Sequence, residues 1–266
     1  MFDKYNRKIT YLRISVTDRC NLRCRYCMPK YGIQLLKHED ILSYDEITEV
    51  VKTAVAFGID KIRLTGGEPL VRKGIVKLVS MLSEIKGIKD LAMSSNGILL
   101  EDFAQSLADA GLHRINISLD TINPEKYKEK TRVGDISKVF NGINAAKAAG
   151  LIPLKINCVV MNSSDELDAK EVAKFCKGKD LEVRFIHKMN LETGNYSIVE
   201  GGDGGNCEKC NRLRLTANGM MKPCLFNDLG YNVRKLGAEE AIKKAVGNKP
   251  HFGTLNLSNK FYNIGG

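Results

Sequence analysis

The chain has 266 residues, of which 43% are hydrophobic and 27% charged, so it is long enough to bury a substantial core. Residues 1–8 are polar, unlike a signal peptide, and no segment approaches the roughly 20 apolar residues that span a bilayer, so we expect no membrane partner. The formal net charge of +10 fits an anionic partner, but the lysines are spread out and do not alternate with aromatic residues, which disfavours nucleic acid.

Short apolar segments alternate with longer helical patterns between residues 10 and 190, as is typical of βα units in a parallel sheet. The predicted strands are residues 11–17, 61–65, 90–94, 114–119, 155–160 and 182–186. The predicted helices are residues 43–57, 73–85, 101–110, 136–149 and 165–177, and Ser43 with Glu46 forms a capping-box pattern. Six such units predict an α/β fold of the incomplete (β/α)6 TIM-type barrel class, although a doubly wound sheet would produce the same alternation.

The composition changes after Asn190. A glycine-rich connection spans residues 201–205, and one further helix is expected at residues 238–245. We place a domain boundary near residue 190, with the barrel in residues 1–190 and a small C-terminal region in residues 191–266. This region is too short to bury a core without leaning on the barrel or on a metal centre.

Six of the eight cysteines fall into two triplets, which indicates metal ligation in a reducing, cytoplasmic setting. The first triplet consists of Cys20, Cys24 and Cys27. The second triplet consists of Cys207, Cys210 and Cys224, and an Asn-Gly turn between the last two predicts a hairpin that brings them together. Three thiolates leave an open position on a metal centre, whereas a zinc site would need to borrow a fourth ligand. Buried, unreactive thiols are a further alternative, but arginines between the first cysteines leave no apolar stripe.

Several predicted strands end in residues suited to a binding site. Gly66-Gly67-Glu68-Pro69 follows the second strand, where glycines allow the backbone to approach a ligand closely. Ser94 and Ser118 end the third and fourth strands. Since barrel active sites lie at the carboxyl ends of the strands, we expect these loops to meet there.

The first triplet, with Tyr26 before its last cysteine, and the Gly-Gly-Glu-Pro loop resemble the radical S-adenosylmethionine (SAM) superfamily. The second triplet and the terminal Gly265-Gly266 make nearly the whole chain similar to one of its families, the MoaA family of GTP 3',8-cyclases in molybdenum cofactor biosynthesis. The resemblance favours the incomplete barrel and implies two [4Fe-4S] clusters, one on each triplet, with SAM on the first. It also implies that a radical derived from SAM removes the 3' hydrogen of GTP, giving 3',8-cyclo-7,8-dihydro-GTP.

The resemblance assigns roles to individual residues. Those matching the SAM-binding positions are Tyr26, Gly66, Gly67, Glu68, Ser118 and Met189. Those matching the GTP-binding positions are Arg13, Arg63, Ser94, Lys155, Arg212 and Arg214, and we add Lys61 and Arg184 to this set. The implied catalytic group is Arg212, Arg214, Gly265 and Gly266. We expect the cations to converge on the barrel mouth, where guanidinium and ammonium groups neutralise a triphosphate.

The implied partners are GTP, a low-potential electron donor and the downstream cyclic pyranopterin monophosphate synthase, and a homodimer is left open. Only 17 residues separate Met189 from Cys207, where the family carries a longer segment, so the cap and any dimer contacts there are expected to differ. Cys158 and Cys176 match no cluster motif and are predicted to pack in the core. Two rival functions are a two-cluster paralogue that modifies a peptide or another small molecule, and a zinc-stabilised nucleic-acid-binding protein.

Overall fold

The structure is a computed structural model that describes residues 1–258 and 260–264. Its centre is a curved sheet with the strand order β6-β5-β4-β3-β2-β1-β7-β8-β9. The six parallel strands of the barrel are β1 (Tyr11–Ser15), β2 (Lys61–Thr65), β3 (Asp90–Ser95), β4 (Arg114–Ser118), β5 (Lys155–Val160) and β6 (Glu182–His187). All six predicted strands are confirmed, with ends that differ by two residues or fewer.

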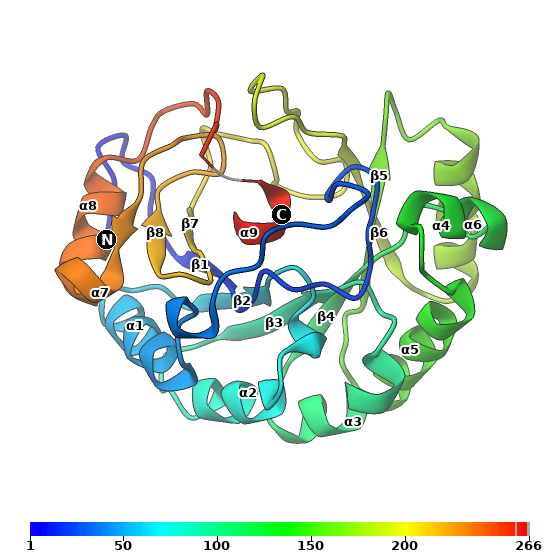
Figure 1. The fold of residues 1–266 in the computed structure, drawn as a ribbon, viewed down its shortest axis with the longest axis horizontal. Coiled ribbons are helices and arrows are strands. Elements are labelled where there is room, and N and C mark those ends of the chain that lie inside the picture. Colours follow the sequence, from blue (N-terminus) through cyan, green and yellow to red (C-terminus); the bar gives the residue numbers. More distant parts are fainter. Residues whose placement is uncertain (259, 265–266) are drawn as a thin grey trace.

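Helices cover the outer side of the sheet and form an arc around it (Figure 1). They are α1 (Tyr44–Ala56), α2 (Ile75–Ser83), α3 (Leu100–Asp109), α4 (Pro124–Thr131), α5 (Ile136–Ala148) and α6 (Leu167–Gly178), with the short 3-10 helices η1 (His38–Asp40) and η2 (Pro69–Val71) in loops. The capping box of Ser43 and Glu46 begins α1 as predicted. Sequence analysis missed α4, which Asn123 caps with its side chain. Among the helices of the described residues, none combines the length and apolar character that a bilayer crossing needs.

The C-terminal region extends the same sheet. It contains β7 (Arg212–Leu215), β8 (Met220–Lys222), β9 (Tyr231–Asn232), α7 (Val233–Leu236), α8 (Ala238–Gly247) and α9 (Phe261–Ile264). β7 pairs with β1 in parallel, and the predicted hairpin joins β7 to β8 through Asn218 and Gly219. The sheet ends at β6 and β9 and is not closed, which confirms an incomplete barrel.

The main core lies between the sheet and its helices. It includes Ile14 on β1, Leu64 on β2 and Val51 on α1, and the predicted core cysteines Cys158 and Cys176 belong to it with 1% exposure each. A second, smaller core consists of Leu191, Leu225, Phe226 and Ile264. The C-terminal region thus joins the barrel through the pairing of β7 with β1, and its own residues form the second core. The boundary near residue 190 stays a prediction.

Candidate active site

The first triplet lies in the loop that follows β1. The backbone N–H groups of Cys27 and Met28 both donate to the Cys24 carbonyl, at 3.0 and 2.9 Å, so the chain turns tightly between the last two cysteines. The Leu22 N–H donates to Cys20 Sγ at 3.4 Å. All three thiols are free and half-buried. One short loop therefore offers three sulfur donors.

Arg132, which sequence analysis did not identify, holds this loop against α4. Its guanidinium donates to the carbonyls of Arg23 and Met28, at 2.5 and 2.9 Å. Arg132 ends α4 with φ at 68°, a left-handed conformation that disfavours residues other than glycine. Local sequence could not reveal this contact, because Arg23 and Arg132 are 109 positions apart.

The Gly-Gly-Glu-Pro loop crosses the cysteine loop at close range. The Gly67 N–H donates to the Thr17 carbonyl and the Glu68 N–H to the Arg19 carbonyl, both at 2.8 Å. A Cβ on Gly67 would lie 2.3 Å from the Arg19 carbonyl oxygen, and one on Gly66 would lie 2.7 Å from that of Thr17. Only glycine fits these two positions, because any side chain would collide with the backbone of the cysteine loop.

Glu68 joins the loops after β2 and β3. Its carboxylate accepts hydrogen bonds from Ser95 Oγ at 2.9 Å and from the N–H groups of Asn96 and Leu70, at 2.7 and 3.1 Å. Burial raises the pKa of Glu68 to about 7, although these donors oppose the shift. Asn96 also donates to Asn21 in the cysteine loop at 2.7 Å, a link that sequence analysis missed.

These loops surround a first cavity of about 210 Å³ at the carboxyl ends of the strands. The predicted site residues that line it are Cys20, Cys24, Tyr26, Cys27, Gly66, Gly67, Glu68, Ser94, Ser118 and Met189. Asp120, at the end of the fourth predicted strand, also lines it. Asp120 accepts a hydrogen bond from the Val159 N–H at 2.8 Å, and burial raises its pKa to about 6.

The second triplet lies at the other end of the barrel, beside the beginning of β7. The Cys210 N–H donates to the Cys207 carbonyl at 3.2 Å, and Tyr196 Oη lies 3.1 Å from Cys207 Sγ. Burial alone would raise the pKa of Cys210, but the charges of Lys249 and Arg212 hold it below its ordinary value. This triplet therefore sits among cations.

A second cavity of about 350 Å³ faces this triplet. The predicted site residues that line it are Arg13, Lys61, Arg63, Arg184, Met189, Cys207, Cys210, Arg212, Arg214 and Cys224. The predicted cations from separate strands do meet in one cavity. It lies at the beginning of the strands rather than at their carboxyl ends, since Lys61 and Arg212 are the first residues of β2 and β7. Lys155, the first residue of β5, lines neither cavity and pairs with Glu182.

Strand register brings the cations of the second cavity together. Arg13 on β1 lies opposite Arg63 on β2 and Arg214 on β7. Like charges on neighbouring strands repel. Burial, followed by the charge of Arg13, lowers the pKa of Arg214 to about 9, and burial is the main cause that lowers the pKa of Arg63 to about 10. An anion in this cavity would relieve the repulsion.

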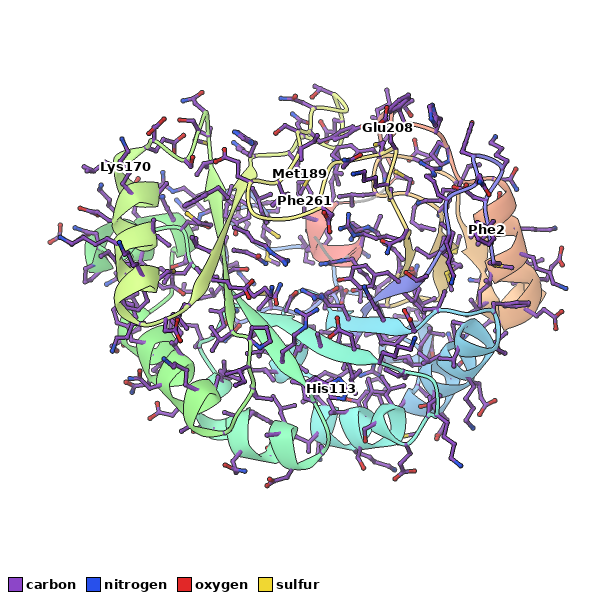
Figure 2. The ribbon with its side chains drawn as sticks, turned by 180° about the vertical axis from the view of Figure 1, so that it is seen from behind. Phe2, His113, Lys170, Met189, Glu208 and Phe261 are labelled. Atoms are coloured by element: carbon purple, nitrogen blue, oxygen red, sulfur yellow. The ribbon has the colours of Figure 1, made fainter. Side chains whose placement is uncertain are left out.

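The two cavities adjoin inside the barrel. Asn157, Ile186 and Met189 line both of them. Figure 2 shows Met189 and Phe261 within the arc of helices, and both belong to the first cavity. Gly265 and Gly266 lie outside the described residues, although Ile264 just before them is 1% exposed. Because the two cavities share three lining residues, a group bound in one cavity would lie next to a group bound in the other.

The donor sets fit iron–sulfur clusters and polar ligands. Within residues 1–258 and 260–264, no group of three or more His, Cys, Asp or Glu side chains is placed to hold a single metal ion. A cluster suits such thiols better, because each thiolate binds a different iron. Buried atoms without a hydrogen-bond partner in this part of the chain include Ser94 Oγ in the first cavity and the Nε atoms of Arg63 and Arg184 in the second. Such atoms mark places that a ligand can complete.

Comparisons with known proteins agree with this geometry. Residues 14–176 match the Radical SAM superfamily. The GTP 3',8-cyclase of Alkaliphilus oremlandii is 42% identical over 86% of this chain and 84% of that protein, and the one of Petrotoga mobilis is 40% identical over 98% and 95%. The chain belongs to the GTP 3',8-cyclase family of radical SAM enzymes. This membership confirms the enzyme class predicted from the sequence, with SAM and iron–sulfur as its cofactors.

The relatives and the solved structures differ from this chain in length. The alignment with the Petrotoga mobilis enzyme is 314 positions long, so that relative has residues this 266-residue chain lacks. Among solved structures, Streptococcus suis SuiB bound to S-adenosylmethionine has a TM-score of 0.66 at 16% identity, covering 94% of this chain and 66% of SuiB. Native anSMEcpe with bound AdoMet has a TM-score of 0.65 at 18% identity, covering 92% and 82%. At these identities the similarity concerns the fold.

Proposed function

We propose that this chain converts GTP to 3',8-cyclo-7,8-dihydro-GTP in the first step of molybdenum cofactor biosynthesis. The observation that carries the proposal is the pair of adjoining cavities, one with three thiols and one with thiols among cations, that share Asn157, Ile186 and Met189. The relatives named GTP 3',8-cyclase support the same reaction.

The first cavity would hold a [4Fe-4S] cluster on Cys20, Cys24 and Cys27, with SAM at its open position. When bound there, the cluster and SAM supply one-electron chemistry that removes a hydrogen atom from the substrate. The chain orients SAM with the backbone of Gly66 and Gly67, which only glycine lets approach so closely. Glu68 stabilises this loop, while the Tyr26, Ser118 and Met189 walls of the cavity exclude water.

The second cavity would hold GTP next to a second [4Fe-4S] cluster on Cys207, Cys210 and Cys224. Cations from several strands surround it. The buried Nε atoms of Arg63 and Arg184 have no hydrogen-bond acceptor among the described residues, and a phosphate oxygen would be a suitable acceptor. Arg212 and Arg214 lie beside the triplet, so they would fix the nucleotide relative to the thiols. In this arrangement the ribose would face the first cavity.

The terminal Gly265-Gly266 would enter the active site, because a tail without side chains can reach a crowded ligand. Support comes from the helix just before it. α9 lies within the arc of helices (Figure 1), and its first residue, Phe261, lines the first cavity. Deletion of both glycines should remove cyclisation while cluster content stays unchanged.

The remaining partners follow from the same proposal. A low-potential electron donor would approach beside the first triplet, where a surface hollow of about 580 Å³ is lined by Arg25, Lys30, Lys128, Glu129 and Arg132. The excess of positive charge favours an acidic donor. The cyclic pyranopterin monophosphate synthase would take the product, and formation of a homodimer stays a prediction.

Anaerobic reconstitution tests this function. Iron and sulfide are quantified first, and two [4Fe-4S] clusters per chain are expected. The protein is then incubated with GTP, SAM and dithionite, and the cyclised nucleotide and 5'-deoxyadenosine are measured by mass spectrometry. Stoichiometric zinc without sulfide would favour the zinc-stabilised binding protein. Two clusters and SAM cleavage without a nucleotide product would favour the paralogue that modifies a peptide or another small molecule.

A further inference from the structure

Lys249 is a fully buried lysine beside the second triplet, with 1% of its surface exposed. It follows α8 and lines the second cavity. Its ammonium donates to the carbonyls of Arg212 and Pro223, both at 2.7 Å, and Lys249 shares the wall of the second cavity with Cys210. Arg212 begins β7 and Pro223 precedes Cys224, so one ammonium ties together the segments that carry two of the three thiols.

The charge of Lys249 has no carboxylate to balance it in the part of the chain that the structure describes. None of the ion pairs among these residues includes Lys249. Burial of an ammonium without a counter-charge is unfavourable by several kcal/mol. The neighbouring Arg212 and Arg214 make the surroundings more positive. The balancing negative charge would therefore come from the thiolates of the second triplet together with the group they hold.

Arg7 offers a contrast at the same place. This residue, 7% exposed, donates to the carbonyls of Cys207, Pro250 and His251, at 2.7, 2.6 and 2.9 Å. Its Nε lies 2.7 Å from the carboxylate of Asp3, which is also buried. Arg7 and Lys249 are thus both buried cations that join distant segments. Asp3 neutralises the charge of Arg7, whereas no carboxylate of the described residues forms an ion pair with Lys249.

We propose that Lys249 is a positioning residue whose positive charge balances the iron–sulfur cluster of the second triplet and raises the reduction potential of that cluster. The inference rests on the proposed function, which assigns a cluster to Cys207, Cys210 and Cys224. Three thiolates on a [4Fe-4S] core of charge +2 give a net charge of −1, and reduction makes the site more negative. A cation beside a ligand sulfur stabilises the reduced state, since charge and hydrogen bonds to the sulfurs are what tune such potentials.

The test uses full-length protein with Cys20→Ala, Cys24→Ala and Cys27→Ala, so that only the second triplet can hold a cluster after anaerobic reconstitution. Lys249→Met keeps the length of the side chain without its charge, and Lys249→Arg keeps the charge. The matched control, Asp3→Asn with Arg7→Met, removes a buried bracing contact with no change in net charge. Iron and sulfide content and the midpoint potential, from a redox titration followed by electron paramagnetic resonance, are measured for each.

Lys249→Met should lower the ratio of reduced to oxidised cluster at least tenfold at fixed potential, which is about 59 mV for a one-electron couple. Lys249→Arg and the control should change it less than about threefold. An equal shift in the control, or an equal shift in Lys249→Arg, would show that Lys249 acts only as a brace. If Lys249→Met holds no cluster, retention in Lys249→Arg supports the proposal and loss in both overturns it. A parent protein that takes up no iron and sulfide would overturn the assignment of the second cluster as well.

Discussion

The two cavities differ in their charged residues although each contains three cysteines. The first holds buried carboxyl groups, and burial raises the pKa of Glu68 to about 7 and that of Asp120 to about 6. The second holds crowded guanidinium groups, and burial lowers the pKa of Arg214 to about 9. The first cavity also contains Lys130 and Lys188, so its charges are mixed, whereas cations predominate in the second, as the polyphosphate of GTP requires. The surroundings of the thiols, rather than the thiols, distinguish the two sites.

The cavities also differ in how the chain builds them. The first triplet comes from one loop, whose contacts with the next loop involve residues close to β1 and β2. The second triplet draws on the hairpin of β7 and β8, on Arg7 near the start and on Lys249 near the end. The cysteines of the first site are therefore brought together by one short loop, although Arg132 also holds that loop, whereas those of the second meet only once the hairpin has formed.

Loss of a cysteine should separate the roles of the sites most strongly. Cys27→Ala should abolish SAM cleavage, because the first triplet would lose a ligand of the cluster that binds SAM. Cys210→Ala should leave appreciable SAM cleavage but little cyclised product, because the second site would position GTP. 5'-deoxyadenosine and cyclised nucleotide are measured separately. Equal loss of both products in both variants, with the other cluster intact, would contradict the division.

Arg214→Met should weaken GTP binding about 10-fold to 100-fold, since a charge-assisted hydrogen bond contributes about 1.5 to 3 kcal/mol. Lys155→Met is the matched comparison, because Lys155 pairs with Glu182 and lines neither cavity. It should change the dissociation constant, measured by titration calorimetry, less than about threefold. A loss as large as that of Arg214→Met would restore the role that the family resemblance assigns to Lys155.

Gly67→Ala should lower the free energy of unfolding by about 1 to 3 kcal/mol, as overpacking does. The added Cβ would lie 2.3 Å from the Arg19 carbonyl oxygen. Gly178→Ala, at the end of α6 with no atom within 4 Å of the new Cβ, is the control and should stabilise the protein by about 0.5 to 1 kcal/mol. Urea unfolding measures both, and equal effects would show that the loop crossing is not rigid.

SAM affinity should depend on pH through Glu68. Its carboxyl group is neutral below a pKa of about 7 and charged above it, and the charged form attracts the ammonium of SAM. Affinity should therefore fall as the pH drops through 7, by up to about tenfold per unit. Calorimetry between pH 6 and 8.5 would follow this fall. The dependence should disappear in Glu68→Gln, and a persistent slope in that variant would assign it to another group.

The sequence predicts best what is local. The six strands, the capping box at Ser43 and the loop of the first triplet all follow from periodicity or short spacing. The Gly67 contact also follows from a short motif, because the glycines lie next to the strand they end.

The rest could not be predicted because it depends on strand order. Arg212 and Arg214 join the other cations of the second cavity because β7 pairs with β1, just after a contact across 201 positions between Thr10 and Asn211. Lys249 and Arg132 look like ordinary surface residues in the sequence. Their importance comes from buried carbonyl groups supplied by distant segments. Residue type alone carries no signal for such contacts.

The pairing of β1 with β7 has a consequence for the order in which the protein matures. β1 can pair with β2 as soon as residue 65 has been synthesised, but its other edge waits for residues 212–215. Contacts between such distant segments form late, because a long loop must close first. Iron and sulfide could thus reach the first triplet on a growing chain while the second site does not yet exist. The strand order thus delays the second cavity until residues 212–215 have been made.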